Sequence, residues 1–232
     1  MATPEVEVLF EDKYLLAVNK PAGLVIERTG HMKSSLETKA FFYLREKEKY
    51  PQKVFIGLPH RLDRPVTGVV VFAKKRSVLK ALVELFRIRE MKKTYYALLE
   101  NTPPQPEAEL SQWYRKNEEL RKAELFNDEQ PNTYRARLIY KVIQQTPVGT
   151  FVEVQLITGK FHQIRAQMAG MGCPIVGDAL YGAKTTYFEN AIALHARRLQ
   201  FVHPVTNETM CIEAPFPANQ FWAALTTPSA TR

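Results

Sequence analysis

One carboxylate in this sequence is flanked on both sides by arginine, in a segment that leads into an apolar run. The segment reads His60-Arg61-Leu62-Asp63-Arg64 and continues through Pro65-Val66-Thr67-Gly68. Neighbouring positive charges favour the ionised form of a carboxyl group and lower its pKa, so we expect Asp63 to be a carboxylate throughout the physiological pH range. Such a group can act as a covalent nucleophile or as a base.

Few other residues offer a competing chemistry. Cys173 and Cys211 are far apart and neither belongs to a Cys-x-x-Cys pair, so we expect no zinc site and no disulfide framework, which fits a reducing cytoplasm. The string His-Arg-x-Asp also occurs in protein-kinase catalytic loops, but the sequence has neither a glycine-rich phosphate loop nor Asp-Phe-Gly. A hydrolase that uses His and Asp would need a Ser or Cys nucleophile within a motif, and none is visible.

The charge distribution favours a polyanionic partner. The 232 residues include 32 Lys and Arg against 24 Asp and Glu, a formal net charge of +8. The excess is concentrated in residues 74–93, where eight basic side chains stand against Glu84 and Glu90. Such a run is more often a solvated helix face than a binding surface, so the charge alone leaves both interpretations open. No apolar run approaches the roughly 20 residues that span a bilayer, and we expect no membrane association.

Apolar patterns predict the elements that must position Asp63. The run Val69-Val70-Val71-Phe72-Ala73 is typical of a buried strand, so residues 60–67 form the loop that leads into it. The basic segment then contains a helix capped by Ser77, with Leu79, Leu82, Val83 and Phe86 on one face. Ser34 and Glu37 resemble a capping box for another helix. We expect further strands at 6–10, 14–19, 94–99, 133–145, 150–157, 193–202 and 208–212, and further helices at about 35–46, 161–171 and 218–225.

Hairpins mixed with a few helices favour an α+β fold over a doubly wound α/β fold. We expect one catalytic domain over residues 1–225, with a mixed, mostly antiparallel sheet, flanking helices and a central basic cleft. No separate N-terminal module is expected, and residues 226–232 are predicted to form a flexible tail. Residues 107–126 give only a weak pattern.

Several blocks of the sequence together resemble the RluA-type pseudouridine synthases. The segment of Asp63 with the strand that ends at Lys74 is similar to that family's signature. Four further blocks occur in the same order along the chain as in the family. They are Asn19-Lys20-Pro21-Ala22-Gly23-Leu24, Lys93-Thr94-Tyr95-Tyr96-Ala97-Leu98, Leu156-Ile157-Thr158-Gly159-Lys160-Phe161-His162-Gln163-Ile164-Arg165 and Gly177-Asp178-x-x-Tyr181-Gly182. Leu194-His195-Ala196 and His203-Pro204 also match. The resemblance covers residues 6–217, with Val66-Thr67 where the family more often has Thr-Ser and Lys160 where it usually has Arg.

The resemblance implies an enzyme that isomerises specific uridines in ribosomal or transfer RNA to pseudouridine, without cofactor or metal. Asp63 would be its catalytic residue, either as a nucleophile at the sugar or as the base that takes the C2′ proton. Tyr95 would stack on the flipped base. Arg165 falls in the first turns of a helix, where a positive charge opposes the helix dipole, so we expect a local partner such as Asp63. Arg61 is the candidate for filling the space that the extruded base leaves.

The predicted RNA contacts combine the motif loops with the basic run. They are His60, Arg61, Arg64, Lys80, Arg87, Lys92, Lys93 and Lys160. We expect the partner to be a structured stem-loop and the protein to be a monomer. The alternative function is a catalytically silent RNA-binding or ribosome-assembly factor on the same fold. The presence of Asp63, Tyr95 and Arg165 together argues against it, because binding alone would not need all three.

Overall fold

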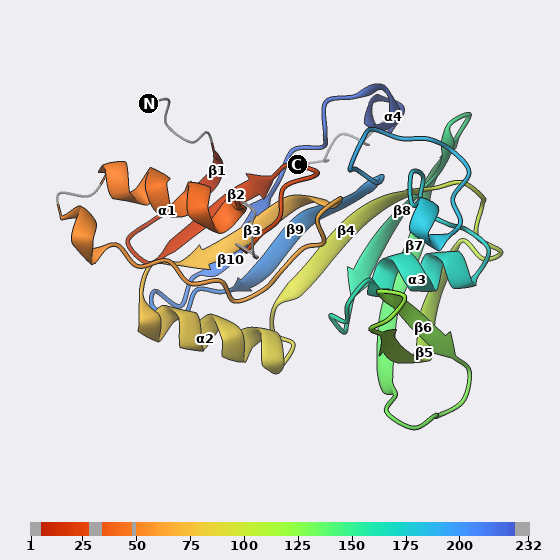
Figure 1. Cartoon of the computed structure of the whole chain (residues 1–232), viewed down its shortest axis with the longest axis horizontal. Helices are drawn as coiled ribbons and strands as arrows, with labels where there is room; N and C mark the ends of the chain where they lie inside the picture. Colours follow the sequence, from red (N-terminus) through yellow and green to blue (C-terminus); the bar gives the residue numbers. More distant parts are fainter. Residues whose placement is uncertain (1–5, 28–33, 48–49, 226–232) are drawn as a thin grey trace. The chain divides into compact units, whose positions relative to one another are not determined.

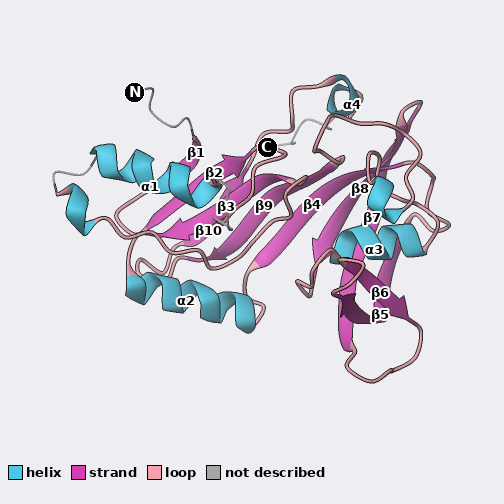
Figure 2. Ribbon diagram, in the orientation of Figure 1, coloured by secondary structure: helices cyan, strands magenta, loops and turns pink. Residues whose placement is uncertain are grey.

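The computed structural model describes residues 6–27, 34–47 and 50–225, which divide into two compact units (Figure 1). Unit 1 comprises the described residues up to Thr94 together with Glu189–Ala191 and Ala196–Pro215, and unit 2 comprises the others. The predicted tail at 226–232 lies outside the described residues. Strands outnumber helices, as Figure 2 shows.

Unit 1 is built on antiparallel strands with two helices. Its elements are β1 (Glu7–Glu11), β2 (Leu15–Lys20), α1 (Leu36–Lys47), the 3-10 helix η1 (Pro51–Lys53), β3 (Thr67–Ala73), α2 (Arg76–Arg87), most of β9 (Leu194–Val202) and β10 (Thr209–Glu213). The strand order is β1-β2-β3-β9-β10. Val78 and Leu82 of α2 pack into a core with Val69 and Val71 of β3. Burial of such a side chain stabilises the fold by about 1.5–3 kcal/mol.

Unit 2 contains a second run of strands and the helix that carries Arg165. Its elements are most of β4 (Lys92–Leu99), β5 (Glu107–Asn117), β6 (Lys122–Phe126), β7 (Tyr134–Thr146), β8 (Gly149–Leu156), α3 (Gln163–Gly170), the 3-10 helix η2 (Ala179–Tyr181) and α4 (Gln220–Ala223). The strand order is β4-β8-β7-β5-β6. Tyr114, Ala123 and Ala136 share one sheet face and pack against Ala166 of α3.

The mixed, mostly antiparallel sheet with flanking helices confirms the predicted α+β class. The division into one catalytic domain stays a prediction. In the part of the chain that the structure describes, no helix has the length and apolar character needed to span a membrane.

Local capping differs from the prediction at two helices. Ser35 rather than Ser34 caps α1, because its Oγ accepts the N–H of Thr38 at 3.1 Å. Helix α2 begins at Arg76, so Ser77 is inside it, and its N-cap residue Lys75 makes no side-chain cap hydrogen bond. The shifts are one residue for α1 and two residues for α2, within the usual uncertainty of helix ends.

Gly68 at the start of β3 allows a close backbone approach. Its φ is +116°, and a Cβ at this position would lie 2.2 Å from the carbonyl oxygen of Ala196. In the register of β2 and β3, Gly68 lies opposite Lys20. The loop that precedes β3 and the turn that follows β2 therefore meet at the same end of this strand pair.

Candidate active site

The loop that carries Asp63 runs beside β3 and is hydrogen-bonded to it. Gly57 and Ala73 exchange two backbone hydrogen bonds, and His60 Nε2 accepts the N–H of Val71 at 3.1 Å. The N–H of Val66 then donates to the carbonyl oxygen of Asp63 at 3.1 Å, which closes a turn at Asp63. The backbone of Asp63 is therefore fixed by a buried strand, as the sequence predicted for a loop leading into β3.

His60 supports this loop through both its nitrogen and its ring face. Acceptance of the Val71 N–H at Nε2 places the ring proton on Nδ1, and the ring stacks on Phe86 with centroids 4.7 Å apart. Burial, together with the charge of Lys93, lowers the pKa of His60 to about 3, so the imidazole stays neutral. These contacts explain His60 as a structural support, and its place among the RNA contacts stays a prediction.

A second clamp joins the turn after β2 to Arg64. The Nζ of Lys20 donates to the carbonyl oxygens of Pro21 at 2.8 Å and of Arg64 at 3.0 Å. The N–H of Gly23 donates to the same Arg64 oxygen at 2.9 Å, and Arg64 Nε donates back to the Gly23 oxygen at 2.9 Å. Three hydrogen bonds thus hold Arg64, the residue next to Asp63.

Lys20 is a buried basic residue near Asp63 that the sequence analysis did not single out. Its side chain is fully buried, and that burial is the main cause that lowers its pKa to about 7, while the negative charge of Asp63 partly opposes the shift. Asp63 therefore lies in the field of a buried amine as well as between two arginines. The available signal was a lysine that ends an apolar strand directly before Pro21.

Arg61 is exposed and has an acidic neighbour. One of its terminal nitrogens lies 3.6 Å from a carboxylate oxygen of Glu27, and 73% of its side chain is exposed. An exposed ion pair of this kind contributes about 0–1 kcal/mol, so a competing anion can displace it. The proposed entry of Arg61 into the vacated base position stays a prediction.

In unit 2, Arg165 is held by Asp178 in a buried, two-pronged ion pair. Arg165 Nε and a terminal nitrogen donate to the two oxygens of Asp178 at 2.7 and 2.8 Å, and both side chains are almost wholly buried. The guanidinium carbon also lies 5.1 Å from the ring centroid of Tyr181. The local partner that the helix dipole argument required is therefore Asp178, and the expected pairing of Arg165 with Asp63 stays a prediction.

Tyr181 connects this ion pair to the neighbouring elements. Its hydroxyl accepts the N–H of Ala123 at 2.7 Å and lies 3.2 Å from Nδ1 of His162. His162 precedes α3 with a φ of +54°, and burial with the nearby charges of Arg165 and Lys116 lowers its pKa to about 3. The block Gly177-Asp178-x-x-Tyr181-Gly182 was recognised in the sequence, but its link to Arg165 requires the fold.

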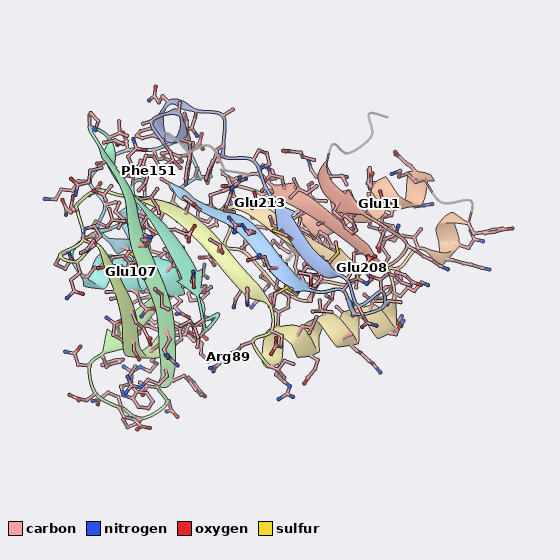
Figure 3. The ribbon with its side chains drawn as sticks, turned by 180° about the vertical axis from the view of Figure 1, so that it is seen from behind. Glu11, Arg89, Glu107, Phe151, Glu208 and Glu213 are labelled. Carbon is pink, nitrogen blue, oxygen red and sulfur yellow. The ribbon has the colours of Figure 1, made fainter. Side chains whose placement is uncertain are left out.

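Of the other predicted site residues, some lie in unit 2 and some in unit 1. Tyr95 is a buried residue of β4, and Lys160 lies before α3 with its Nζ 4.7 Å above the ring of Tyr134. Lys80 and Lys92 are exposed in unit 1, whereas Lys93 is half-buried, and burial beside Arg89 lowers its pKa to about 8. Arg89 follows α2 (Figure 3), and its φ of +65° is left-handed.

The basic run is less uniformly available than its composition indicates. Arg87 donates two hydrogen bonds to Glu84, at 2.7 and 2.5 Å. Lys74 is mostly buried, 3.0 Å from Glu11, and also donates to the carbonyl of Asp12. Lys80 and Lys92 are therefore the stronger candidates for phosphate contacts. Over the described ranges, no group of three or more His, Cys, Asp or Glu side chains could hold a metal ion.

Comparison with known proteins identifies the family. A family model described as RNA pseudouridylate synthase matches residues 14–170, well over half of the chain. This chain belongs to the RNA pseudouridylate synthase family. The matched range of the synthase model contains Asp63, Tyr95 and Arg165.

Curated synthases support the same assignment over most of the chain. A ribosomal large subunit pseudouridine synthase C of Vibrio vulnificus is 33% identical over 221 residues, which cover 90% of this chain and 65% of that protein. A tRNA pseudouridine synthase C of Vibrio parahaemolyticus is 33% identical over 233 residues, 92% of each protein. The chain thus spans just under two thirds of the first of these synthases and nearly all of the second.

Solved synthase structures share the fold. Human RNA pseudouridylate synthase domain containing 4 is 26% identical, with a TM-score of 0.75 over 94% of this chain and 90% of that one. Human RNA pseudouridylate synthase domain containing 1 is 18% identical with a TM-score of 0.73 over 94% and 86%, a likeness of fold alone.

Proposed function

We propose that this chain isomerises specific uridines of ribosomal or transfer RNA to pseudouridine, with Asp63 as the catalytic carboxylate. In this reaction the bond between N1 of the base and C1′ of the sugar breaks, the base rotates, and a bond forms between C5 and C1′. C5 loses a proton and N1 gains one. The conversion is redox-neutral, so it consumes neither oxidant nor reductant.

One observation carries the proposal: the family match includes Asp63 in a loop whose backbone is fixed on both sides. An ionised carboxylate is required for either route of the reaction. Asp63 attacks C1′ and is later displaced by C5, or it removes the C2′ proton and leaves a glycal. In its protonated form, the buried amine of Lys20 adds a positive charge that interacts with Asp63.

Tyr95 and Arg165 have distinct proposed roles. Tyr95 stacks on the extruded base and takes or relays the C5 proton. Arg165 supplies a fixed positive charge for the catalytic carboxylate, because the fork with Asp178 prevents the guanidinium from turning toward solvent. Extrusion of the base costs a few kcal/mol, which Arg61 offsets by filling the space left in the stack.

By their names, the two Vibrio relatives act on ribosomal RNA and on transfer RNA, and this chain is 33% identical to each of them. We propose a structured stem-loop as the substrate and a monomeric enzyme. Pseudouridine mapping of total RNA from cells with and without the gene tests this assignment. One or a few sites should lose pseudouridine when the gene is deleted, and the purified chain should restore them.

The rival function is a silent RNA-binding or ribosome-assembly factor. It predicts an unchanged pseudouridine map on deletion, together with altered levels of ribosomal subunits or of their precursors. The same cells therefore distinguish the two functions.

A further inference from the structure

Three lysines of unit 2 lie over aromatic rings. The Nζ of Lys116 is 5.1 Å from the ring centroid of Phe161, that of Lys160 is 4.7 Å from Tyr134, and that of Lys122 is 5.8 Å from Tyr181. A ring face attracts an ammonium group and limits the conformations of its long side chain. These charges are therefore partly ordered before any ligand binds.

The rings connect the three lysines into one surface. Phe161 stacks on His162 with centroids 3.7 Å apart, and the hydroxyl of Tyr181 reaches Nδ1 of His162. Tyr134 lies opposite Tyr114 in the β5–β7 register, on the sheet face that α3 covers. Lys116 is two residues beyond Tyr114 in β5 and so points to the same face.

The opposite face of the same strands has a different character. There Arg137 pairs with Glu109 and Arg115 pairs with Glu124, so the charges are largely compensated within the protein. On the α3 face, Lys116 has one acidic neighbour, Glu118, at 2.6 Å, and 76% of that side chain is exposed. Such an exposed pair is weak and a phosphate can replace the carboxylate.

Tyr134 adds an open ring to the charged face. It is 61% exposed, although it lies in a strand next to buried residues. Exposed aromatic rings between basic side chains are the means by which proteins stack the bases of single-stranded RNA while their phosphates are neutralised.

We propose that Lys116, Lys122, Lys160 and Tyr134 form a basic–aromatic surface that binds single-stranded nucleotides next to the target uridine. This proposal rests on the proposed function for its ligand. The lysines contact successive phosphates and the ring of Tyr134 stacks on a base. Paired RNA fits less well, because its bases are already stacked on one another and do not reach Tyr134.

The test compares two triple variants that remove the same charge, one from the lysines that lie over aromatic rings and one from the far face of β7. Lys116→Gln/Lys122→Gln/Lys160→Gln alters the basic–aromatic surface, and Arg135→Gln/Arg137→Gln/Lys141→Gln alters the other face of β7. Binding of a fluorescent single-stranded oligoribonucleotide and of a duplex of equal length is measured from 50 to 200 mM salt. Loss of three phosphate contacts should reduce the log–log salt slope by about 2, because each contact on a single strand contributes about 0.7.

Between 50 and 200 mM salt, the affinity for the single strand should fall in both proteins. The fall should be about twentyfold larger for the parent than for the lysine variant. Tyr134→Leu should weaken binding at every salt concentration with the slope unchanged, since stacking releases no counterions. An equal slope change in the two triple variants would reduce the effect to net charge and overturn the proposal. An equal loss on the duplex would assign the surface to paired RNA instead. Absence of pseudouridine formation by the parent would refute the proposed function while leaving these binding results interpretable.

Discussion

At the scale of single residues, Lys20 combines a structural and an electrostatic task. A neutral amine has two N–H groups, which match its two carbonyl acceptors, Pro21 and Arg64. A protonated amine adds a charge beside Asp63 but loses hydration in its buried position. With a pKa of about 7, both forms are populated near neutral pH.

Lys20→Met should change the pH dependence of stability. In the folded chain Lys20 has a pKa of about 7, against 10.5 as its ordinary value, so between these pH values the unfolded chain binds more protons. The contribution of Lys20 to the free energy of unfolding therefore rises with pH in this range. The rise is about 3 kcal/mol from pH 7 to pH 9.5. Urea unfolding of parent and variant at several pH values measures the difference.

The control is Lys13→Met, which removes a lysine that is exposed rather than buried. If the difference in unfolding free energy between the parent and Lys20→Met were independent of pH, burial would not lower the pKa of Lys20 in the folded chain.

Arg165→Ala should lower the free energy of unfolding by about 3–5 kcal/mol, because the carboxylate of Asp178 is left buried without its partner. The double variant Arg165→Ala/Asp178→Asn should recover much of the stability, since the unpaired charge is gone. Thermal melting and turnover are measured together.

The double variant also separates structure from catalysis. It should fold yet form no pseudouridine, because Arg165 is still missing. Turnover near the parent's level in this variant would remove Arg165 from the active site.

At the scale of elements, α2 and the residues after it should supply the salt-sensitive part of RNA binding. Lys80→Gln/Lys92→Gln should reduce the log–log salt slope by about 1.5, since each phosphate contact contributes about 0.7 to 0.9. Arg87→Gln should have a smaller effect per charge, because Glu84 already holds that guanidinium. The slopes are measured by titrating a stem-loop RNA at increasing salt concentrations. An unchanged slope in the double variant would show that Lys80 and Lys92 contact only solvent.

The start of β3 should tolerate no side chain at Gly68. Gly68→Ala would place a Cβ 2.2 Å from the carbonyl oxygen of Ala196 in a left-handed conformation, which should cost more than about 3 kcal/mol. Gly172→Ala is the matched control, because its φ of +79° is also left-handed but no atom lies within 4 Å. It should cost about 1 kcal/mol of strain alone. Denaturant unfolding would contradict this account if both variants lost equal stability.

The sequence predicted most elements because their apolar patterns are local. It placed the strand of residues 69–73 and the helix of Leu82 correctly, since burial of one face imposes a period on the residues. It resolved neither β5 nor β6, because the outer face of β5 carries Trp113 and Arg115 and so lacks a clear polar alternation. The ties of Lys20 to Arg64 and of Arg165 to Asp178 join separate segments, and no local pattern encodes such pairs.

At the scale of the whole molecule, the predicted machinery is distributed over both units. Asp63 with its support from Lys20 belongs to unit 1, whereas Tyr95 and Arg165 belong to unit 2. Strands β4 and β9 each contribute residues to the two units. The chain therefore cannot be divided at one position in its sequence without removing part of the proposed site.

The catalytic assignment of Asp63 is tested most directly by counting pseudouridine made by Asp63→Asn. The amide keeps the shape of the side chain but lacks the charge that a nucleophile or base requires. Purified parent and variant are incubated with unmodified ribosomal and transfer RNA, and pseudouridine is quantified by mass spectrometry after nuclease digestion. The parent should form pseudouridine and the variant none, while RNA affinity stays near the parent's because it rests mainly on phosphate contacts. Pseudouridine formation by Asp63→Asn at the parent's rate would contradict the account.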